Sequence, residues 1–213
     1  MINFIPIFPL EIVVYPGEQV NLHIFEDRYK QLINECYAEK KSFGIPAVIN
    51  SSVAEFGTLV RITEIAEVYD DGRMDIHTQG ISVFRILEVV KSIPNKLYSG
   101  AIVNYPHNEE YLQLNMMRQV ISAIRELHKL LKINKDFKKA DEQLSSYDVA
   151  HHAGLTLQEE YELLGLFRED QRLEYLKRHL TKILPMVAGV ESIKDKIKFN
   201  GHFRELKGFN FDF

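Results

Sequence analysis

The stretch from Phe8 to Tyr29, FPLEIVVYPGEQVNLHIFEDRY, restricts the fold of this chain more than any other segment. Apolar residues first occupy alternate positions, namely Leu10, Ile12 and Val14. This pattern predicts a strand with one buried face. Pro16 and Gly17 then predict a turn, because proline presets φ and glycine accepts the left-handed conformation that follows. Alternation resumes at positions 20, 22 and 24, so we expect a hairpin or a wide corner.

An amphipathic helix is expected directly after this corner. Apolar residues recur at helical spacing and fall on one side of it: Phe25, Tyr29, Leu32, Ile33, Cys36 and Tyr37. Glu26 and Asp27 suit its first turn, where negative charge interacts favourably with the helix dipole. Glu26 and Arg28 would point to different sides, so we assign each a structural role, with a functional charge pair as the alternative. Cys36 is the single cysteine, which excludes an intrachain disulfide and favours a core position.

Composition and charge exclude several classes of protein. The chain has 213 residues, of which 46% are hydrophobic, and this is enough for one large or two small domains with a core. A net charge of -4 argues against the phosphate backbone as the main partner. No run of about 18 apolar residues is present, and the N-terminus lacks the basic region of a signal peptide. We therefore expect a soluble cytoplasmic protein without a membrane partner.

The two halves of the chain have different periodicities. Up to Pro106, short alternating segments with turn signals at Asp71-Gly72 and Gln79-Gly80 predict a closed or nearly closed β structure. Beyond Pro106, helical spacing dominates, with a capping box at residues 156–159. A helix opening at Glu169 would place leucines inward and the basic residues outward, the latter being Arg172, Lys177, Arg178 and Lys182. Pro185 predicts a kink or a fresh helix start.

Several motifs occur in an order that resembles the Lon N-terminal domain. They are Val14-Tyr15-Pro16-Gly17, the helix start at residues 22–29, Gly57-Thr58-Leu59-Val60-Arg61-Ile62, Asp71-Gly72-Arg73, and residues 79–86 with Gly80 and Phe84. This is the substrate-binding domain of ATP-dependent Lon proteases, which also occurs in stand-alone bacterial proteins. The family commonly has proline in place of Asp27 and a polar residue in place of Val83. Structural roles are implied for the motif residues Pro16, Gly17, Glu26, Arg28, Arg61, Gly80 and Phe84.

The resemblance implies an α+β fold with two lobes. Residues 1–106 would form a PUA-like β pseudo-barrel of about six strands with one packed helix. Residues 107–198 would form an all-α helical-bundle lobe. Residues 199–213 would form a Phe-rich C-terminal tail.

The sequence contains no recognisable catalytic or metal-binding motif. A phosphate loop, a G-x-S-x-G elbow and an H-E-x-x-H motif are all missing from it. The adjacent pair His151-His152 would point about 100° apart on a helix, so the two rings are poorly placed to share one metal ion. In Lon, the ATPase and Ser-Lys protease modules belong to other domains. We therefore expect no catalytic residues, no metal and no cofactor, and not an enzyme.

A cluster of basic residues raises the possibility of RNA binding. The cluster consists of Arg125, Lys129, Lys132, Lys135, Lys138 and Lys139. Glu126 and Asp136 dilute it, and no aromatic side chains are interleaved for base stacking. We interpret it as a solvated face and do not expect nucleic acid as a partner.

The predicted function is therefore binding of polypeptide segments or of a protein partner. Candidate contacts are Phe8, Tyr15, Phe25 and Tyr29, for which a core position is the competing interpretation, and Phe209 and Phe211 of the tail. An exposed tail of this kind would form an apolar patch, so it is expected to dock on its own protein, on a partner or on a second copy. The alternatives are an adaptor that docks on a folded protease or chaperone, an RNA-binding module, and an uncharacterised enzyme.

Overall fold

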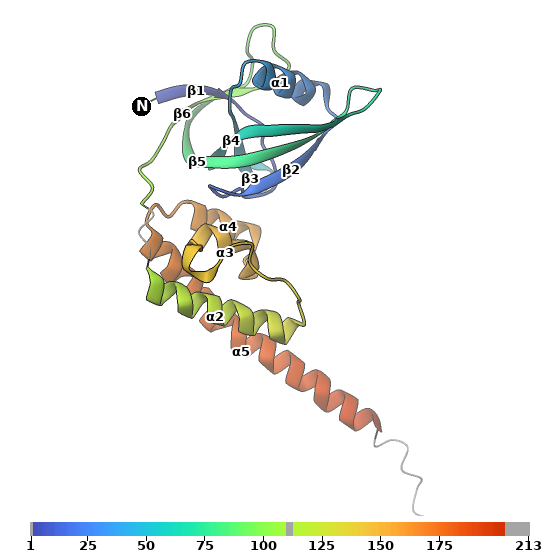
Figure 1. Ribbon diagram of the computed structural model, residues 1–213, viewed down its shortest axis with the longest axis vertical. Coiled ribbons are helices and arrows are strands. Elements are labelled where there is room, and N and C mark those ends of the chain that lie inside the picture. Colours follow the sequence, from blue (N-terminus) through green and yellow to red (C-terminus); the bar gives the residue numbers. More distant parts are fainter. Residues whose placement is uncertain (1, 110–112, 203–213) are drawn as a thin grey trace, which may run out of the picture.

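The computed structural model describes residues 2–109 and 113–202 (Figure 1). The strand-rich part, residues 2–104, contains six strands and one helix: β1 (Ile2–Pro6), β2 (Gln19–Ile24), α1 (Asp27–Ala38), β3 (Phe43–Ile49), β4 (Ser52–Val68), β5 (Met74–Val90) and β6 (Gly100–Asn104). The helical part, residues 114–202, contains α2 (Leu114–Leu131), η1 (Asp141–Gln143), α3 (Ser146–Val149), η2 (Ala150–His152), α4 (Leu157–Leu164) and α5 (Glu169–His202).

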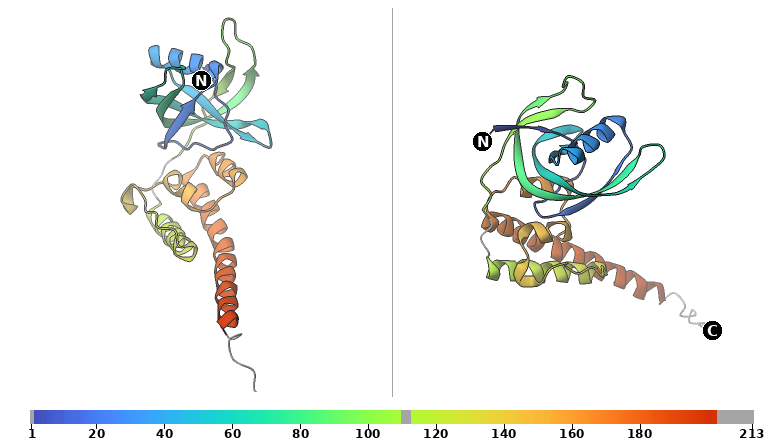
Figure 2. Two further views of the ribbon diagram at one scale, coloured as in Figure 1. Left: turned by 90° about the vertical axis from the view of Figure 1, so that its right-hand side faces the viewer. Right: turned by 45° about the horizontal axis from the view of Figure 1, so that its top comes forward.

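One antiparallel sheet forms the strand-rich part, with the strand order β1-β6-β5-β4-β3. The long strand β5 pairs with β4 from Met74 to Arg85, and with β2 and then β6 on its other side. Isolated parallel bridges join Ile7 to Gly44 and Leu10 to Ala47, so the chain after β1 lies against β3. The sheet therefore curls towards closure, as the views in Figure 2 show. Helix α1 covers one end of it (Figure 1).

The segment before β2 is not the strand of a hairpin that the sequence predicts. It forms only the isolated bridges to β3, and β2 pairs instead with β5. Val13 and Val14 are both buried while Ile12 is 37% exposed, which breaks the predicted alternation. Long β5 offers β2 a continuous partner, whereas the preceding segment begins at Pro9 and ends at Pro16, which have no N–H to donate.

Helix α1 confirms most of the expected inward face and corrects its two ends. Tyr29, Leu32, Ile33 and Cys36 are buried, whereas Phe25 is 61% and Tyr37 is 51% exposed. Phe25 precedes the helix, because Glu26 is its N-cap residue. The direction of the Phe25 side chain therefore follows the in-and-out alternation of β2, in which Ile24 points inward and Phe25 points outward.

The predicted turn at Asp71-Gly72 is confirmed, but the predicted bend at Gln79-Gly80 is not. Gly72 has φ of 79°, as a tight turn between β4 and β5 requires. Gly80 lies inside continuous β5, where the register against β4 shifts between Leu59 and Val60. Glycine at position 80 lets the backbone of Tyr15 pass close to β5, and it does not form a turn.

The capping box predicted at Thr156 is confirmed, since its side chain accepts from Glu159 N–H and the Glu159 carboxylate accepts from Thr156 N–H. The fresh helix start predicted as one alternative at Pro185 is wrong, because α5 is one helix of 34 residues that passes through this proline. The other alternative, a kink at Pro185, stays a prediction. Its C-terminal portion extends away from the remainder of the molecule (Figures 1 and 2). Residues 199–202, predicted as tail, belong to this helix, and residues 203–213 with Phe209 and Phe211 lie outside the described residues.

The prediction that Arg172 faces outward is also wrong, because its side chain is completely buried. The guanidinium pairs with the Glu169 carboxylate at 2.8 Å and lies 4.2 Å from the centre of the Tyr147 ring. It donates hydrogen bonds to side-chain or carbonyl oxygens of Asn108, Glu109, Ser146, Leu166 and Glu169. Arg172 therefore lies on the buried face of α5, where an apolar residue is usual, because its guanidinium hydrogen-bonds the buried polar groups around it.

One hydrophobic core is shared by the two parts of the structure. Side chains from the strand-rich part, Val13, Tyr15, Ala47 and Val83, belong to the same buried cluster as α2, α3, α4 and α5. A second cluster joins α1 to the sheet. The division at residue 106 stays a prediction, and the shared cluster predicts that the two parts unfold together.

Candidate functional site

A groove lies where the strand-rich part meets the helical part. It consists of two adjoining pockets of about 420 and 620 Å³ that share residues from both sides: Pro16, Gly17, Gln79, Lys139, Tyr147 and Asp148. We call it the central groove. Glu18, Gln19, Lys135, Asp136, Lys138, His151 and His152 line its first pocket, and Arg61, Gly80, Ile81, Gln143 and Ser145 line its second.

The strand-side wall is built on a tight turn. Glu18 N–H donates to the Tyr15 carbonyl at 3.1 Å, with Pro16 and Gly17 at the central positions and φ of 83° at Gly17. This is the arrangement of a type II turn. Gly17 and Glu18 then oppose Gly80 as a β-bulge, because Gly17 donates to the Gly80 carbonyl and Gly80 donates to the Glu18 carbonyl. The turn is thus held directly on β5.

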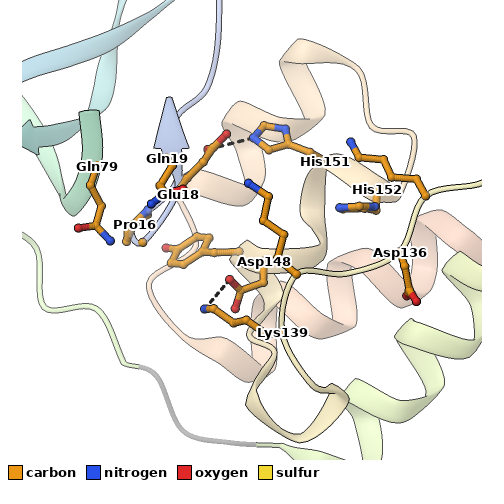
Figure 3. A pocket seen from close by; sticks show the side chains of 13 residues that line it. Pro16, Glu18, Gln19, Gln79, Asp136, Lys139, Asp148, His151 and His152 are labelled. Carbon is orange, nitrogen blue, oxygen red and sulfur yellow. Dashed lines mark hydrogen bonds and ion pairs between the residues drawn. The ribbon is translucent and has the colours of Figure 1, made fainter. Parts of the chain in front are cut away.

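The opposite wall comes from the loop after α2 and from the short helices that follow. Ser145 caps α3 through a reciprocal pair of hydrogen bonds with Asp148. Asp148 also forms an ion pair of 2.7 Å with Lys139, which is drawn in Figure 3. Helix α2 ends at Lys132 in the left-handed conformation, with φ of 56°. The chain therefore leaves the helix before the lysines of the groove.

His151 connects the two walls. Its Nδ1 lies 2.7 Å from Glu160 of α4. Its Nε2 lies 3.1 Å from Glu18 of the turn, a contact drawn in Figure 3. Burial of the ring lowers the pKa of His151, but the hydrogen bonds to Glu160 and Glu18 outweigh this effect and raise the pKa to about 9. His151 is therefore an imidazolium at neutral pH. The ring of Tyr15 packs against the His151 ring, with ring centres 4.8 Å apart.

The neighbouring ring of His152 has the opposite character. Burial, together with Lys135 and His128, lowers the pKa of His152 to about 4, so this ring is neutral at pH 7. The two histidines point to different surroundings, as the sequence predicts for adjacent residues. Within residues 2–109 and 113–202, no group of three or more His, Cys, Asp or Glu side chains is arranged to hold a metal ion.

Comparison with known proteins identifies the fold. The model of the ATP-dependent protease La (LON) substrate-binding domain family matches residues 5–182. The chain belongs to this family. Comparison with curated proteins gave no match.

Solved Lon N-terminal domains share the architecture. A Lon N-terminal domain protein from Xanthomonas campestris is 24% identical, with a TM-score of 0.63, over 82% of this chain and 96% of that one. The N-terminal domain of the Mycobacterium avium complex Lon protease is 16% identical, with a TM-score of 0.61, over 84% of this chain and 98% of that one. At these identities the likeness establishes the Lon-type fold.

Four of the Lon-motif residues line the central groove: Pro16, Gly17, Arg61 and Gly80. The other three lie elsewhere. Phe84 is buried in the sheet core, and Arg28 Nε donates to Glu26 at 2.9 Å. Glu26 and Arg28 therefore pair with each other, which corrects the expectation that they point to different sides.

The aromatic residues predicted as peptide contacts do not line this groove. Phe8, Tyr15 and Tyr29 are buried, and the rings of Phe8 and Tyr29 stack with centres 3.8 Å apart. Phe25 is exposed on the strand-rich part. The role of these four residues as peptide contacts stays a prediction. The three buried rings occupy the core positions that the sequence gives as the alternative.

Sequence reasoning missed the Glu18–His151–Glu160 cluster. Glu18 and His151 are 133 residues apart, and no local pattern links them. Lys135, Lys138 and Lys139 were part of the basic cluster noted in the sequence. Only the tertiary structure shows that these three lysines line one groove opposite the Pro16-Gly17 turn.

Among the described residues, no helix combines the length and apolar character needed to cross a membrane.

Proposed function

We propose that this Lon-family domain binds segments of polypeptide in the central groove and does not alter them chemically. The observation that carries the proposal is the position of Pro16, Gly17, Arg61 and Gly80, the motif residues that line this groove. The family is described by its substrate-binding role. Placement of its motif around a groove supports the groove as the place where that role is performed.

The chemistry of the groove suits an extended polypeptide. Side-chain amides of Gln19 and Gln143 lie on opposite walls, and an amide group both donates and accepts hydrogen bonds. The Gln79 amide oxygen accepts from Arg61, which leaves its N–H groups as donors towards the groove. A peptide backbone presents donors and acceptors in alternation, so amide side chains complement it whatever its sequence. The two adjoining pockets give the groove room for consecutive side chains.

A non-catalytic role agrees with how the reactive groups of the groove are used. The Ser145 hydroxyl donates to Asp148 at 2.9 Å within the helix cap. His151 is engaged on both ring nitrogens by carboxylates. We further propose that the curled sheet is a PUA-like pseudo-barrel, which the bridges from Ile7 and Leu10 to β3 support.

Groove-filling variants test this function. Gln19→Trp and Gln143→Trp place an indole into the groove from opposite walls, and both wild-type side chains are exposed. Binding of short, fluorescently labelled unstructured peptides of acidic, neutral and basic composition would be measured by anisotropy. We expect the double variant to bind at least about tenfold more weakly, a loss of about 1.4 kcal/mol.

The matched control is Gln171→Trp, the same substitution at an exposed position of α5 outside the groove. It should bind like the wild type. Unchanged binding by the groove double variant, or no binding of any peptide by the wild type, would contradict the proposal.

A further inference from the structure

We propose that the central groove selects acidic segments of polypeptide. This inference rests on the proposed function and specifies its substrate class. It is supported by the charged side chains on the two walls of the groove, some of which form ion pairs, whereas several cations do not.

The acidic residues of the groove already have cationic partners. Glu18 accepts from His151 at 3.1 Å, and Asp148 pairs with Lys139 at 2.7 Å. Asp136 lies 4.0 Å from Arg125, whose guanidinium also forms two hydrogen bonds of 2.8 Å with Asp141. The negative charge of these carboxylates is therefore partly compensated, since His151 and Arg125 are each shared between two carboxylates.

Three cations of the groove have no such partner. Arg61 donates to the amide oxygen of Gln79 at 2.6 Å, which orients the guanidinium without neutralising it. Within the described part of the chain, neither Arg61, Lys135 nor Lys138 forms an ion pair with a carboxylate, and all three line the groove. The groove is lined by five cations, Arg61, Lys135, Lys138, Lys139 and the imidazolium of His151, and by three carboxylates, Glu18, Asp136 and Asp148. This is an excess of about two positive charges in a chain whose net charge is -4.

These cations lie on both walls. Arg61 and Gln79 are a cross-strand pair on β4 and β5, whereas Lys135 and Lys138 belong to the loop after α2. A bound segment would therefore meet a planar guanidinium on one side and ammonium groups on the other. Arginine binds a carboxylate with two parallel hydrogen bonds, and lysine acts as a point charge, so carboxylates at intervals along a segment satisfy both.

Polypeptide fits this groove better than nucleic acid. Glu18, Asp136 and Asp148 also line it, and an evenly charged phosphate backbone would be repelled wherever it passed them. Among the described residues that line the groove, Tyr147 is the one phenylalanine, tyrosine or tryptophan, and only 4% of it is exposed, so it offers no face for base stacking. Acidic side chains can be spaced to avoid the three carboxylates.

The test compares three unstructured peptides of equal length, with acidic, neutral and basic side chains, and a single-stranded RNA oligonucleotide as a fourth probe. We expect the acidic peptide to bind the intact protein at least about tenfold more tightly than the basic peptide, with affinity falling as salt increases. The variant Lys135→Glu/Lys138→Glu should abolish or reverse this preference. Lys177→Glu/Lys182→Glu, at exposed positions of α5 outside the groove, should retain it.

The outcomes separate this inference from the function on which it rests. Equal binding of all three peptides, weakened by Gln19→Trp/Gln143→Trp, would overturn the selectivity and leave peptide binding in place. Failure of the wild type to bind any peptide would overturn both. Tighter binding of RNA than of the acidic peptide, lost in the double glutamate variant, would assign the groove to nucleic acid.

Discussion

At Gly80 the backbone of β5 passes so close to the Tyr15 carbonyl that a side chain has no room. A Cβ atom built on this residue would lie 2.2 Å from the Tyr15 oxygen. We predict that Gly80→Ala lowers the free energy of unfolding by about 2–4 kcal/mol, because backbone atoms must move to relieve the overlap. Urea denaturation followed by circular dichroism would measure the change.

Gly189→Ala is the matched control, since a Cβ atom there meets nothing within 4 Å. It lies in a helix, where alanine is favoured over glycine, so its stability should be unchanged or up to about 1 kcal/mol higher. Equal stability of Gly80→Ala and wild type would show that the turn does not depend on this close approach.

The buried network around Arg172 makes a second prediction at the residue scale. Arg172→Met removes the guanidinium and leaves the carboxylate of Glu169, itself only 5% exposed, without its cationic partner. The expected loss is about 3–5 kcal/mol of unfolding free energy, because an uncompensated charge stays buried. Thermal and urea denaturation would measure it.

Arg168→Met provides the comparison on the same stretch of chain. Arg168 is 57% exposed and pairs with Asp170 at 2.7 Å on the surface. Its loss should cost less than about 1 kcal/mol. Similar effects of the two substitutions would refute the assignment of Arg172 as the centre of a buried network.

At the scale of the element, α5 shows how tertiary packing overrides a local signal. Pro185 removes one backbone donor, yet the helix continues on both sides of it. Before the proline, Leu173, Leu176 and Leu180 are completely buried. Packing of these leucines stabilises the helix before Pro185, and the helix then continues although one backbone hydrogen bond is missing.

We predict that Pro185→Ala raises the stability of the C-terminal portion of α5. Alanine restores the N–H and removes the clash with the carbonyl four residues earlier, so the local helix gains about 1–3 kcal/mol. Amide hydrogen exchange at residues 181–190 should slow, and the far-ultraviolet helical signal should increase. Met186→Ala, at a side chain that is 62% exposed, should change neither measurement. An unaltered exchange pattern in Pro185→Ala would contradict the prediction.

At the scale of the whole molecule, His151 links the two parts through charge. The ring faces Glu18 of the turn and Glu160 of α4, with Tyr15 packed against it. The pKa of His151 is raised from 6.5 to about 9. Because the folded state binds this proton more tightly, the stabilisation is fully present below about pH 6.5 and disappears as the pH rises through about 9.

The expected measurement is a difference between two proteins across pH. Wild type should be more stable than His151→Gln by a constant amount below about pH 6.5, and the difference should fall by about 1–2 kcal/mol towards pH 9, a value reduced for solvent screening. About a third of the His151 side chain is exposed, at 34%, which is the reason for the reduction. His107→Gln, at a ring that is 86% exposed, is the surface control for the substitution itself. A difference that grows between pH 6.5 and pH 9 would contradict the raised pKa.

Much of the local structure was predictable because its causes lie within a few residues. The turn at Pro16-Gly17 depends on the φ preferences of two adjacent residues. The capping box at Thr156 and Glu159 depends on two side chains three positions apart. The inner face of α1 follows from spacing alone. The motifs that identify the Lon family are of the same kind, which is why they could be recognised in the sequence.

The candidate site was only partly predictable. Its motif residues and its lysines are visible in the sequence, but the groove exists because the turn after residue 15 meets a loop more than 100 residues later. Phe25 was expected inside and lies outside, since the strand before it sets its direction. Arg172 was expected outside and lies inside, because Asn108 and Ser146 supply partners that spacing cannot reveal.

The amino-acid sequence by itself determined the turns at Pro16-Gly17 and Asp71-Gly72, the capping box at Thr156, the inward face of α1 and the change from strands to helices, since these arise from short-range sterics and hydrogen bonding. Only the tertiary structure decided which strand pairs with β2, which charges are buried and which remain unpaired around the groove. Those outcomes depend on contacts between distant residues, as the pair Glu18 and His151 illustrates across 133 positions.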